Sequence, residues 1–327
     1  MRVAVVGATG SLGTELLAVL DESPLVVREL VPIASERSFG TEVEFRGGVF
    51  PVETELTAVR GCDLAFLCAP ADVSLEAVRA LLHARVAAID CSGALVASPE
   101  VPLIGELGVP GMVSLDAPML AVPPGLSLAC TRVLAPLARA FGISRAVATL
   151  LVSASASGAG RAAVEALAEE TIALLSQQEL PDPPSLGVPI AFDVLPWIGT
   201  AEDDGTTAHE RGFASVLRRT LGDASVAVTS VRMPTFCGDG AALAIELREP
   251  ASLEAVLDVL GKVPGVAQAG VGPTTRAAAG SELVHVGRVR RDESRVGGVL
   301  LWLAADGVRL SAAHAVRVAE ARSAGRA

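Results

Sequence analysis

The chain has 327 residues, enough for two domains with sizeable cores, and 51% of its residues are hydrophobic while 19% are charged. This composition is typical of a soluble globular protein. Its 26 basic and 37 acidic residues give a net charge of −11, which argues against nucleic-acid partners and acidic membrane surfaces.

The start of the chain, MRVAVVGATG, enters a glycine turn without a hydrophobic signal core or a cleavage site. No apolar run approaches the ~18 residues that a membrane helix needs, so we expect a cytoplasmic protein without a membrane partner. The five cysteines are Cys62, Cys68, Cys91, Cys130 and Cys237. Their odd number and scattered positions fit reduced thiols and match no zinc spacing, so we expect no metal site.

The N-terminal part alternates between strand and helix patterns. Residues 2–6 form a continuous apolar run, as in a strand that is buried on both faces, and the helical run TELLAVLDE follows a glycine turn. Further strands are expected at residues 25–33, 62–70 and 84–92, with a helix at residues 73–84. This alternation predicts a Rossmann-like, doubly wound parallel sheet in an α/β protein.

After about residue 122 the pattern changes to long alternating segments. These are SRAVATLLVSAS, SVAVTSVRMP, AALAIELRE, VHVGRVRR and VLLWLAA. Only two long helices and a proline-rich loop, LPDPPSLGVP, are expected between them. We therefore predict a C-terminal α+β domain with a largely antiparallel sheet and helices on one face.

The glycine turn GATGSLG lies between the first strand and the first helix. Gly7 would make the tight bend, Gly10 would let the chain approach a pyrophosphate, and Gly13 would allow close helix packing. The helix start would offer N–H donors to the anion. We assign cofactor contacts here to Gly7, Thr9, Gly10, Ser11, Leu12 and Gly13. The alternative is a purely structural turn.

The loop ASERSFG ends the second predicted strand. Ser35, Arg37 and Ser38 could hold a 2′-phosphate, which favours NADP over NAD. Glu36 argues the other way, because it could face a free 2′-hydroxyl. The arginine could also belong to a solvated loop with no ligand.

A second glycine-rich turn follows a strand in SASASGAGRAAVEAL. Ser157, Gly158 and Gly160 could bring the backbone close to a cofactor or a substrate, and we assign them to the cofactor. Small residues also serve ordinary tight turns.

Polar residues follow a strand in VRMPTFCGDG. Arg232 could bind a carboxylate with two hydrogen bonds, and Asp239 could act as an acid or base. An ordinary surface pair is the alternative. The histidines are isolated in sequence, and a structural or surface role is expected for His83, His209, His285 and His314.

The stretch AVPPGLSLACTR predicts a helix that starts near Gly125 and Leu126, with free N–H groups but no reactive side chain. Cys130 lies more than one turn further and shares a helical stripe with Val133 and Leu137. We therefore expect the Cys130 thiol to face the core and to be inert.

Together, these segments resemble the aspartate-semialdehyde dehydrogenase family. The resemblance runs through GATGSLG, ASERSFG, SGAG, IAFDVLPWIG, LGDASVAVTSVRMPTF, VGRVRRD and LWLAAD. It implies an NADP-binding Rossmann domain at residues 1–123, a dimerisation and substrate domain at residues 124–305, and a C-terminal helix at residues 306–327 that returns to the first domain. It also implies a homodimer.

In that family a cysteine attacks the aldehyde, hydride passes to NADP, and phosphate releases the acyl group. The family's nucleophile falls here on Gly125, a position anchored by VLAPLARAFGISR, and the family's histidine falls on Asp239. Arg232 matches the substrate arginine, and the family's glutamine falls on Ala154. The resemblance therefore gives no confident catalytic residue.

Other family positions also differ. The phosphate-binding arginine is replaced by Val96, and the first acidic residue and the lysine of a family helix fall on His209 and Gly212. Glu210 falls on the second acidic residue of that helix and retains its carboxylate. We assign Glu210 and Arg232 as the residues that bind a small carboxylate ligand.

The chain is similar to a cysteine-lacking group of paralogues in this family. The shared features are SGAL at residues 92–95 and Gly238 followed by Asp239.

Three functional hypotheses follow. The first is an NADP-binding homologue, with a binding or regulatory role, that does not perform the phosphorylating oxidation. The second is an NADP-dependent oxidoreductase acting directly on a small carboxylate-bearing carbonyl or imine, with Arg232 binding the carboxylate and Asp239 assisting proton transfer. The third is retained aspartate-semialdehyde dehydrogenase activity, in amino-acid biosynthesis, through another thiol such as Cys91 or Cys237.

Overall fold

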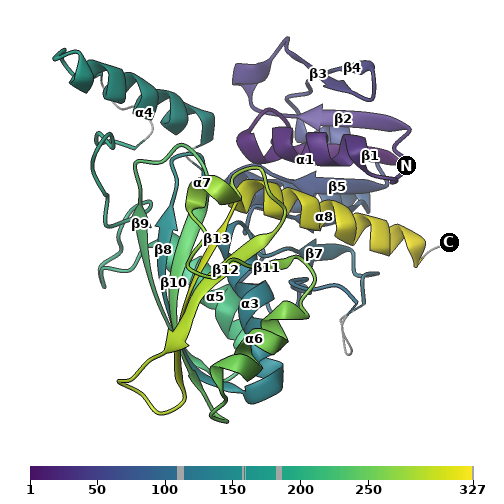
Figure 1. The fold of residues 1–327 in the computed structure, drawn as a ribbon. Helices are drawn as coiled ribbons and strands as arrows, with labels where there is room; N and C mark the ends of the chain where they lie inside the picture. The colour runs from purple at the N-terminus through teal and green to yellow at the C-terminus, as the bar shows by residue number, and fades with distance from the viewer. Residues whose placement is uncertain (109–113, 157, 159, 182–185, 326–327) are drawn as a thin grey trace. The chain divides into compact units, whose positions relative to one another are not determined.

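The protein is represented by a computed structural model that describes residues 1–108, 114–156, 158, 160–181 and 186–325. The chain divides into two compact units. Unit 1 comprises Met1–Pro124 and Ser311–Ala327, and unit 2 comprises Gly125–Leu310. Each unit contains one large β-sheet (Figure 1).

The sheet of unit 1 has five parallel strands in the order β2-β1-β5-β6-β7. The strands are β1 (Arg2–Val6), β2 (Glu29–Ile33), β5 (Leu64–Leu67), β6 (Ala87–Asp90) and β7 (Met119–Ala121). The central strand β5 is buried at every residue, which explains its continuous apolar sequence. With helices α1 (Ser11–Glu22) and α2 (Ala71–Ala84) between strands, this arrangement confirms the predicted doubly wound parallel sheet.

Some elements of unit 1 differ from the prediction. Strand β2 starts at Glu29 rather than at residue 25. A hairpin of β3 (Glu42–Phe45) and β4 (Gly48–Pro51) was not predicted, and neither was β7. Two short 3-10 helices, η1 (Glu36–Ser38) and η2 (Leu56–Val59), complete the connections.

The C-terminal helix α8 (Gly307–Ala324) belongs to unit 1 from Ser311 onwards. Two buried side chains attach this part of the helix to unit 1. His314 Nε2 lies 2.8 Å from the Ile104 carbonyl oxygen. Arg322 Nη1 donates to the carbonyl oxygens of Leu115 and Ala117, each at 2.6 Å.

The sheet of unit 2 has six strands in the order β11-β12-β13-β10-β8-β9. The strands are β8 (Ile143–Val152), β9 (Ser225–Arg232), β10 (Asp239–Leu247), β11 (Val266–Gln268), β12 (Val284–Arg291) and β13 (Gly298–Ala305). The four central strands pair antiparallel, as predicted, but the outer strands β9 and β11 each run parallel to their neighbour. The sheet is therefore mixed.

Helices of unit 2 pack mainly on one face of this sheet (Figure 1). The helices are α3 (Leu126–Phe141), α4 (Gly160–Leu175), α5 (Ala208–Leu221), α6 (Leu253–Gly261) and α7 (Thr275–Ala278). Residues 126–137 of α3 are all buried, so this helix is central to the core of unit 2. Helix α6 was not predicted, because only two long helices were expected between the strands.

In the part of the chain that the structure describes, no helix combines the length and the apolar character needed to cross a membrane.

Candidate functional site

The glycine turn of unit 1 joins β1 to α1. Gly7 has a φ of +87°, and a Cβ added there would lie 2.6 Å from the amide nitrogen of Ala69. A Cβ on Gly13 would lie 2.1 Å from the carbonyl oxygen of Gly7. These two glycines are required by the packing of the protein itself.

Gly10 differs from these glycines. A Cβ on Gly10 would approach only the Gly7 carbonyl oxygen, at 3.4 Å, and Gly10 has an ordinary φ of −78°. Gly10 is the N-cap of α1, and no side chain caps this helix start, which is formed by Ser11 and Leu12. The N–H groups that no side chain caps, and the open approach at Gly10, suit an anionic ligand such as a pyrophosphate.

The loop after β2 lies against the glycine turn. The hydroxyl groups of Thr9 and Ser38 form a hydrogen bond of 3.0 Å. Ser35, Glu36 and Arg37 are exposed in this loop. The residues predicted to contact the cofactor in the two segments therefore lie at the same end of the unit 1 sheet.

The second glycine-rich turn lies in unit 2, between β8 and α4. Gly158 and Gly160 have positive φ angles of +80° and +58°, so both use a conformation that favours glycine. Ser157, the third predicted cofactor residue of this turn, lies outside the described residues.

Three chain segments of unit 2 meet at Gly125, Asp239 and Gly307. Gly125 is the N-cap of α3, with a φ of +52°. A Cβ on Gly307, the first residue of α8, would lie 2.7 Å from Oδ2 of Asp239 and 3.0 Å from Cα of Gly125. The starts of two helices therefore converge on the Asp239 carboxylate, which suits a negative charge.

Asp239 is buried and holds the end of β8. Its Oδ1 accepts hydrogen bonds from the amide and the hydroxyl of Ser153, at 2.8 and 2.9 Å. Burial and, to a smaller extent, the charge of the nearby Asp306 raise the pKa of Asp239 to about 6, although the hydrogen bonds from Ser153 oppose this shift. Asp239 is therefore a carboxyl group that can change protonation near neutral pH.

Arg232, the last residue of β9, is also buried. Its Nη1 donates to the carbonyl oxygens of Ser153 and Ala156, at 2.7 and 2.8 Å. Burial lowers the pKa of Arg232, and the charge of Asp239 opposes this effect. The guanidinium therefore fixes the chain that leads into the second glycine-rich turn.

Glu210 belongs to the N-terminal capping box of α5. Its Oε2 accepts from the amide and hydroxyl of Thr207, at 2.9 and 3.0 Å, and its Oε1 accepts from the amide of Ser230 at 2.9 Å. Burial raises the pKa of Glu210, but these hydrogen bonds outweigh it and the pKa is lowered overall. Both carboxylate oxygens thus have partners within the protein, which favours a structural role.

His209 lies beside Glu210, and its Nδ1 is 2.9 Å from the hydroxyl oxygen of Ser230. Burial and the positive charge of Arg232 lower the pKa of His209 to about 4, although Glu210 opposes this shift. His209 is therefore neutral at physiological pH.

Comparison with known proteins identifies the family. The family model described as the NAD binding domain of semialdehyde dehydrogenase matches residues 2–108, and the model for its dimerisation domain matches residues 134–310. The chain belongs to the semialdehyde dehydrogenase family.

Relatives in this family match almost the whole chain. Aspartate-semialdehyde dehydrogenase from Aquifex aeolicus is 33% identical, over 98% of this chain and 97% of the relative. The USG-1 protein homolog from Pseudomonas aeruginosa is also 33% identical, over 96% of this chain and 94% of the relative. The crystal structure of aspartate semialdehyde dehydrogenase II from Vibrio cholerae, complexed with ASA, has a TM-score of 0.87 at 32% identity and covers 98% of this chain and 97% of its own.

Three other positions, to which the resemblance assigned functional residues, carry a small or apolar residue. Ala154 and Val96 are buried in units 2 and 1, and Gly212 lies half-buried in α5. None of the three side chains can form an ion pair or donate a proton.

The cysteines of unit 2 do not resemble an activated thiol. Cys130 is fully buried, which confirms the predicted core position, and burial raises its pKa. Cys237 is exposed, but partial burial and then the charges of Asp306 and Asp239 raise its pKa. A reactive thiol requires the opposite shift.

The sequence did not predict the central position of Ser153 or Gly307 in this cluster. Ser153 follows β8 and Gly307 follows β13 at the same end of the sheet, but an isolated serine or glycine forms no recognisable sequence motif. No group of three metal-ligating side chains occurs among the described residues.

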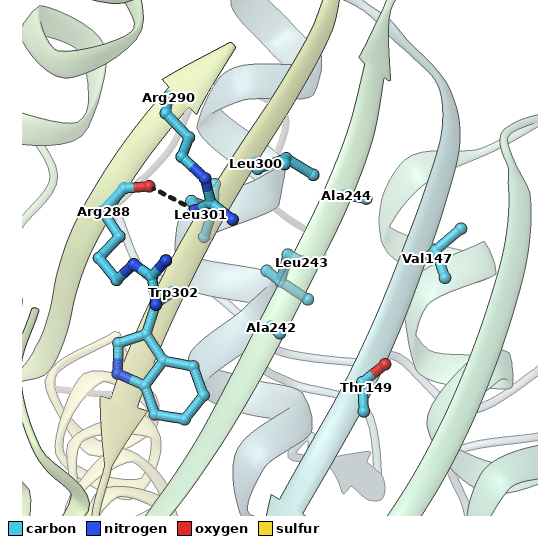
Figure 2. Close-up of a pocket in the computed structure, with 10 residues that line it drawn as sticks. All are labelled: Val147, Thr149, Ala242, Leu243, Ala244, Arg288, Arg290, Leu300, Leu301 and Trp302. Atoms are coloured by element: carbon cyan, nitrogen blue, oxygen red, sulfur yellow. Dashed lines mark hydrogen bonds between the residues drawn. The ribbon is translucent and has the colours of Figure 1, made fainter. Parts of the chain in front are cut away.

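A separate pocket lies on the sheet of unit 2, away from the predicted residues. Figure 2 shows Arg288, Arg290 and Trp302 beside smaller side chains of β8 and β10. Thr149 and Ala242 are exposed on this face, so the face lacks the helical cover of the opposite side. This pocket contains no residue of the predicted site.

Proposed function

We propose that the protein is an NAD(P)-binding member of its family that does not catalyse the phosphorylating oxidation of an aldehyde. The observation that carries this proposal is Gly125, which starts α3 where the resemblance assigns the nucleophile and which has no side chain to react. A thiol at a helix start would be activated by the N–H groups there. On this proposal the protein has a binding or regulatory role.

The other parts of the cluster support the same reading. The resemblance assigns Asp239 to the position of the family's histidine, and Oδ1 of Asp239 already accepts two hydrogen bonds from Ser153. Cys237, the exposed thiol nearby, has a raised pKa. Retained activity through another thiol therefore has little support.

For the cofactor we propose NADP rather than NAD. Arg37 and Ser35 are exposed beside the glycine turn, and the bond between Thr9 and Ser38 holds this loop there. A guanidinium and hydroxyl groups can bind a 2′-phosphate. The exposed Glu36 favours NAD and makes the comparison of the two cofactors necessary.

We further propose a homodimer formed by the exposed face of the unit 2 sheet. Helices α3, α5 and α6 pack against the sheet, whereas Thr149, Ala242 and the half-buried Trp302 lie on the uncovered face. An apolar sheet face of this kind is stabilised when a second copy covers it. Sedimentation of the wild-type protein and of Ala242→Arg would test this, with a shift of the variant to monomer expected.

A second candidate function is favoured by Asp239. Its pKa of about 6 suits an acid or base in direct hydride transfer between NADP and a small carboxylate-bearing substrate. Arg232 would then bind the carboxylate, but its Nη1 already bonds to two carbonyl oxygens. Because these two hydrogen bonds already occupy Nη1 of Arg232, the binding role is the better supported proposal.

The test begins with titration of the pure protein with NADPH and NADH by calorimetry. The protein is then assayed with aspartate semialdehyde and phosphate, and with a panel of keto acids. We expect tighter binding of NADPH and no turnover. Absence of any dinucleotide binding would contradict both candidates, whereas phosphate-dependent NADPH formation would show that family activity is retained, and reduction of a keto acid would favour the second candidate.

A further inference from the structure

Two cysteines of unit 1 follow adjacent parallel strands. Cys68 follows β5 and Cys91 follows β6, and the last paired residues of these strands are Leu67 and Asp90. The amide of Cys91 donates to the carbonyl oxygen of Leu67 at 3.0 Å, which continues the ladder by one step. Cys68 and Cys91 therefore stand opposite each other.

This position brings the two thiols together. Opposed residues of neighbouring parallel strands point to the same face, and strands lie about 4.8 Å apart, within the Cα separation that a disulfide allows. The neighbouring Cys68 side chain, together with burial, raises the pKa of Cys91 well above its usual value, as expected for two adjacent thiols.

The two cysteines differ in access. Cys91 is fully buried, whereas Cys68 is partly exposed. A small oxidant from solvent can reach Cys68 first, and Cys91 then lies behind it as the second thiol of the pair.

Cys68 also contacts the glycine turn. A Cβ on Gly7 would lie 2.8 Å from the carbonyl carbon of Cys68, and the amide of Cys68 donates to the carbonyl oxygen of Val6 at 2.8 Å. The backbone at Cys68 therefore cannot move without moving the turn at Gly7.

We propose that Cys68 and Cys91 form a peroxide-oxidisable thiol pair beside the dinucleotide turn. A peroxide transfers one oxygen to the Cys68 sulfur, giving a sulfenic acid and releasing water or an alcohol. The Cys91 sulfur then attacks the Cys68 sulfur, the S–O bond breaks, and the oxygen leaves as water with the Cys91 proton. Two thiols thus lose two electrons and two protons, and the peroxide is reduced.

The effect on ligand binding rests on the proposed dinucleotide site. Forming the disulfide pulls the chain at Cys68 toward β6, and the contact with Gly7 transmits this shift to the turn. Oxidised protein should bind NADPH about tenfold more weakly, and bound NADPH should shield Cys68.

The experiment uses the full chain carrying Cys237→Ser, which removes the exposed thiol. The protein is treated with hydrogen peroxide, blocked with N-ethylmaleimide in denaturant and digested without reduction. Trypsin leaves Cys62 with Cys68 on the peptide 61–79, and Cys91 with Cys130 on the peptide 86–132. Fragment spectra, together with the variants Cys68→Ser and Cys91→Ala, assign the linkage.

We expect a link between Cys68 and Cys91 that reducing agent removes and that both variants abolish. A Cys68 that stays alkylatable, or that reaches sulfinic acid without a link, would overturn the proposal. NADPH titration before oxidation separates the two hypotheses: a linked protein that never binds dinucleotide contradicts the proposed function alone, and an unlinked protein that binds NADPH contradicts the thiol pair alone.

Discussion

Asp239 and Ser153 are joined by two hydrogen bonds to one oxygen, because Oδ1 of Asp239 accepts from both the amide and the hydroxyl of Ser153. The carbonyl oxygen of Ser153 accepts from Arg232 at 2.7 Å. The end of β8 is therefore fixed by side chains from β9 and β10. Arg232 and Asp239 act on the same residue, which links the predicted ligand residues to the stability of the sheet end.

The first prediction concerns the charge of Asp239. Burial places its folded pKa at about 6, above the unfolded value of 3.8, so its contribution to stability is full below pH 3.8 and is lost as the pH rises through 6. The difference corresponds to about 3 kcal/mol at most. In Asp239→Asn this loss is absent, so the free energy of unfolding of the variant, relative to that of the wild-type protein, should increase as the pH rises from about 4 to 7.

Urea unfolding across this pH range measures the effect. Asp203→Asn, which changes an exposed carboxylate, is the control. The amide of the variant also changes the hydrogen bonding with Ser153. The resulting change in the free energy of unfolding does not vary with pH, because an amide does not titrate in this range. Identical pH slopes for Asp239→Asn and the wild-type protein would show that Asp239 is not a perturbed acid.

His209 should act in the opposite pH direction. Burial and Arg232 lower its pKa from 6.5 to about 4, so its contribution is full above pH 6.5 and is lost as the pH falls through 4. His209→Asn keeps a polar atom near Ser230 but cannot take up a proton. We expect the variant to lose about 1 to 3 kcal/mol less stability than the wild-type protein on acidification.

The same unfolding series, read from about pH 7 down to pH 4, tests this expectation. His83→Asn is a matched control, because His83 is exposed on α2. If acidification destabilises the wild-type protein and His209→Asn equally, then His209 does not stay neutral in the folded state.

The sequence predicted the main elements of unit 1 because their signals are local. The run at β1 is continuous and apolar, and Gly7 and Gly13 mark the turn that follows. The hairpin of β3 and β4 lacks such a signal, since its strands have only four residues each and β4, with the sequence GVFP, begins with a glycine and ends with a proline. Strand β7, with only three residues, is too short for a periodic pattern.

The cluster in unit 2 was only partly predictable. The sequence pointed to Arg232 and Asp239 because they are charged residues close to strand ends. Gly125 was identified only because the resemblance places the family's nucleophile there. Ser153 lies 79 residues from Arg232 and 86 from Asp239 along the chain. Only the pairing of β8 with β9 and β10 brings them together, and no local pattern encodes that register.

Gly10 and Gly13 provide a matched pair for the dinucleotide site. Gly13→Ala should destabilise the protein by about 1 to 3 kcal/mol or more, because its Cβ would overlap the Gly7 carbonyl oxygen. Gly10→Ala meets no such contact and should leave the free energy of unfolding within about 1 kcal/mol of wild type. If a pyrophosphate approaches Gly10, the same methyl group should weaken NADPH binding about tenfold or more. Unchanged NADPH affinity in a stable Gly10→Ala protein would move the ligand away from this turn.

The last prediction is that Gly125→Cys does not restore family activity. Nothing lies within 4 Å of an added Cβ, so the thiol fits, but the backbone conformation at φ +52° and ψ −129° strains any residue other than glycine by about 1 to 3 kcal/mol. The nearby Asp239 carboxylate would raise the pKa of the new thiol, whereas catalysis needs a thiolate. We expect no phosphate-dependent NADPH formation from aspartate semialdehyde, measured by the absorbance of the reduced nicotinamide. Gly125→Ala controls for the backbone strain, and Gly125→Cys with Asp239→His tests the charge. Activity in the single variant would mean that Gly125 alone separates this chain from its catalytic relatives and that the remaining groups are still able to support the reaction.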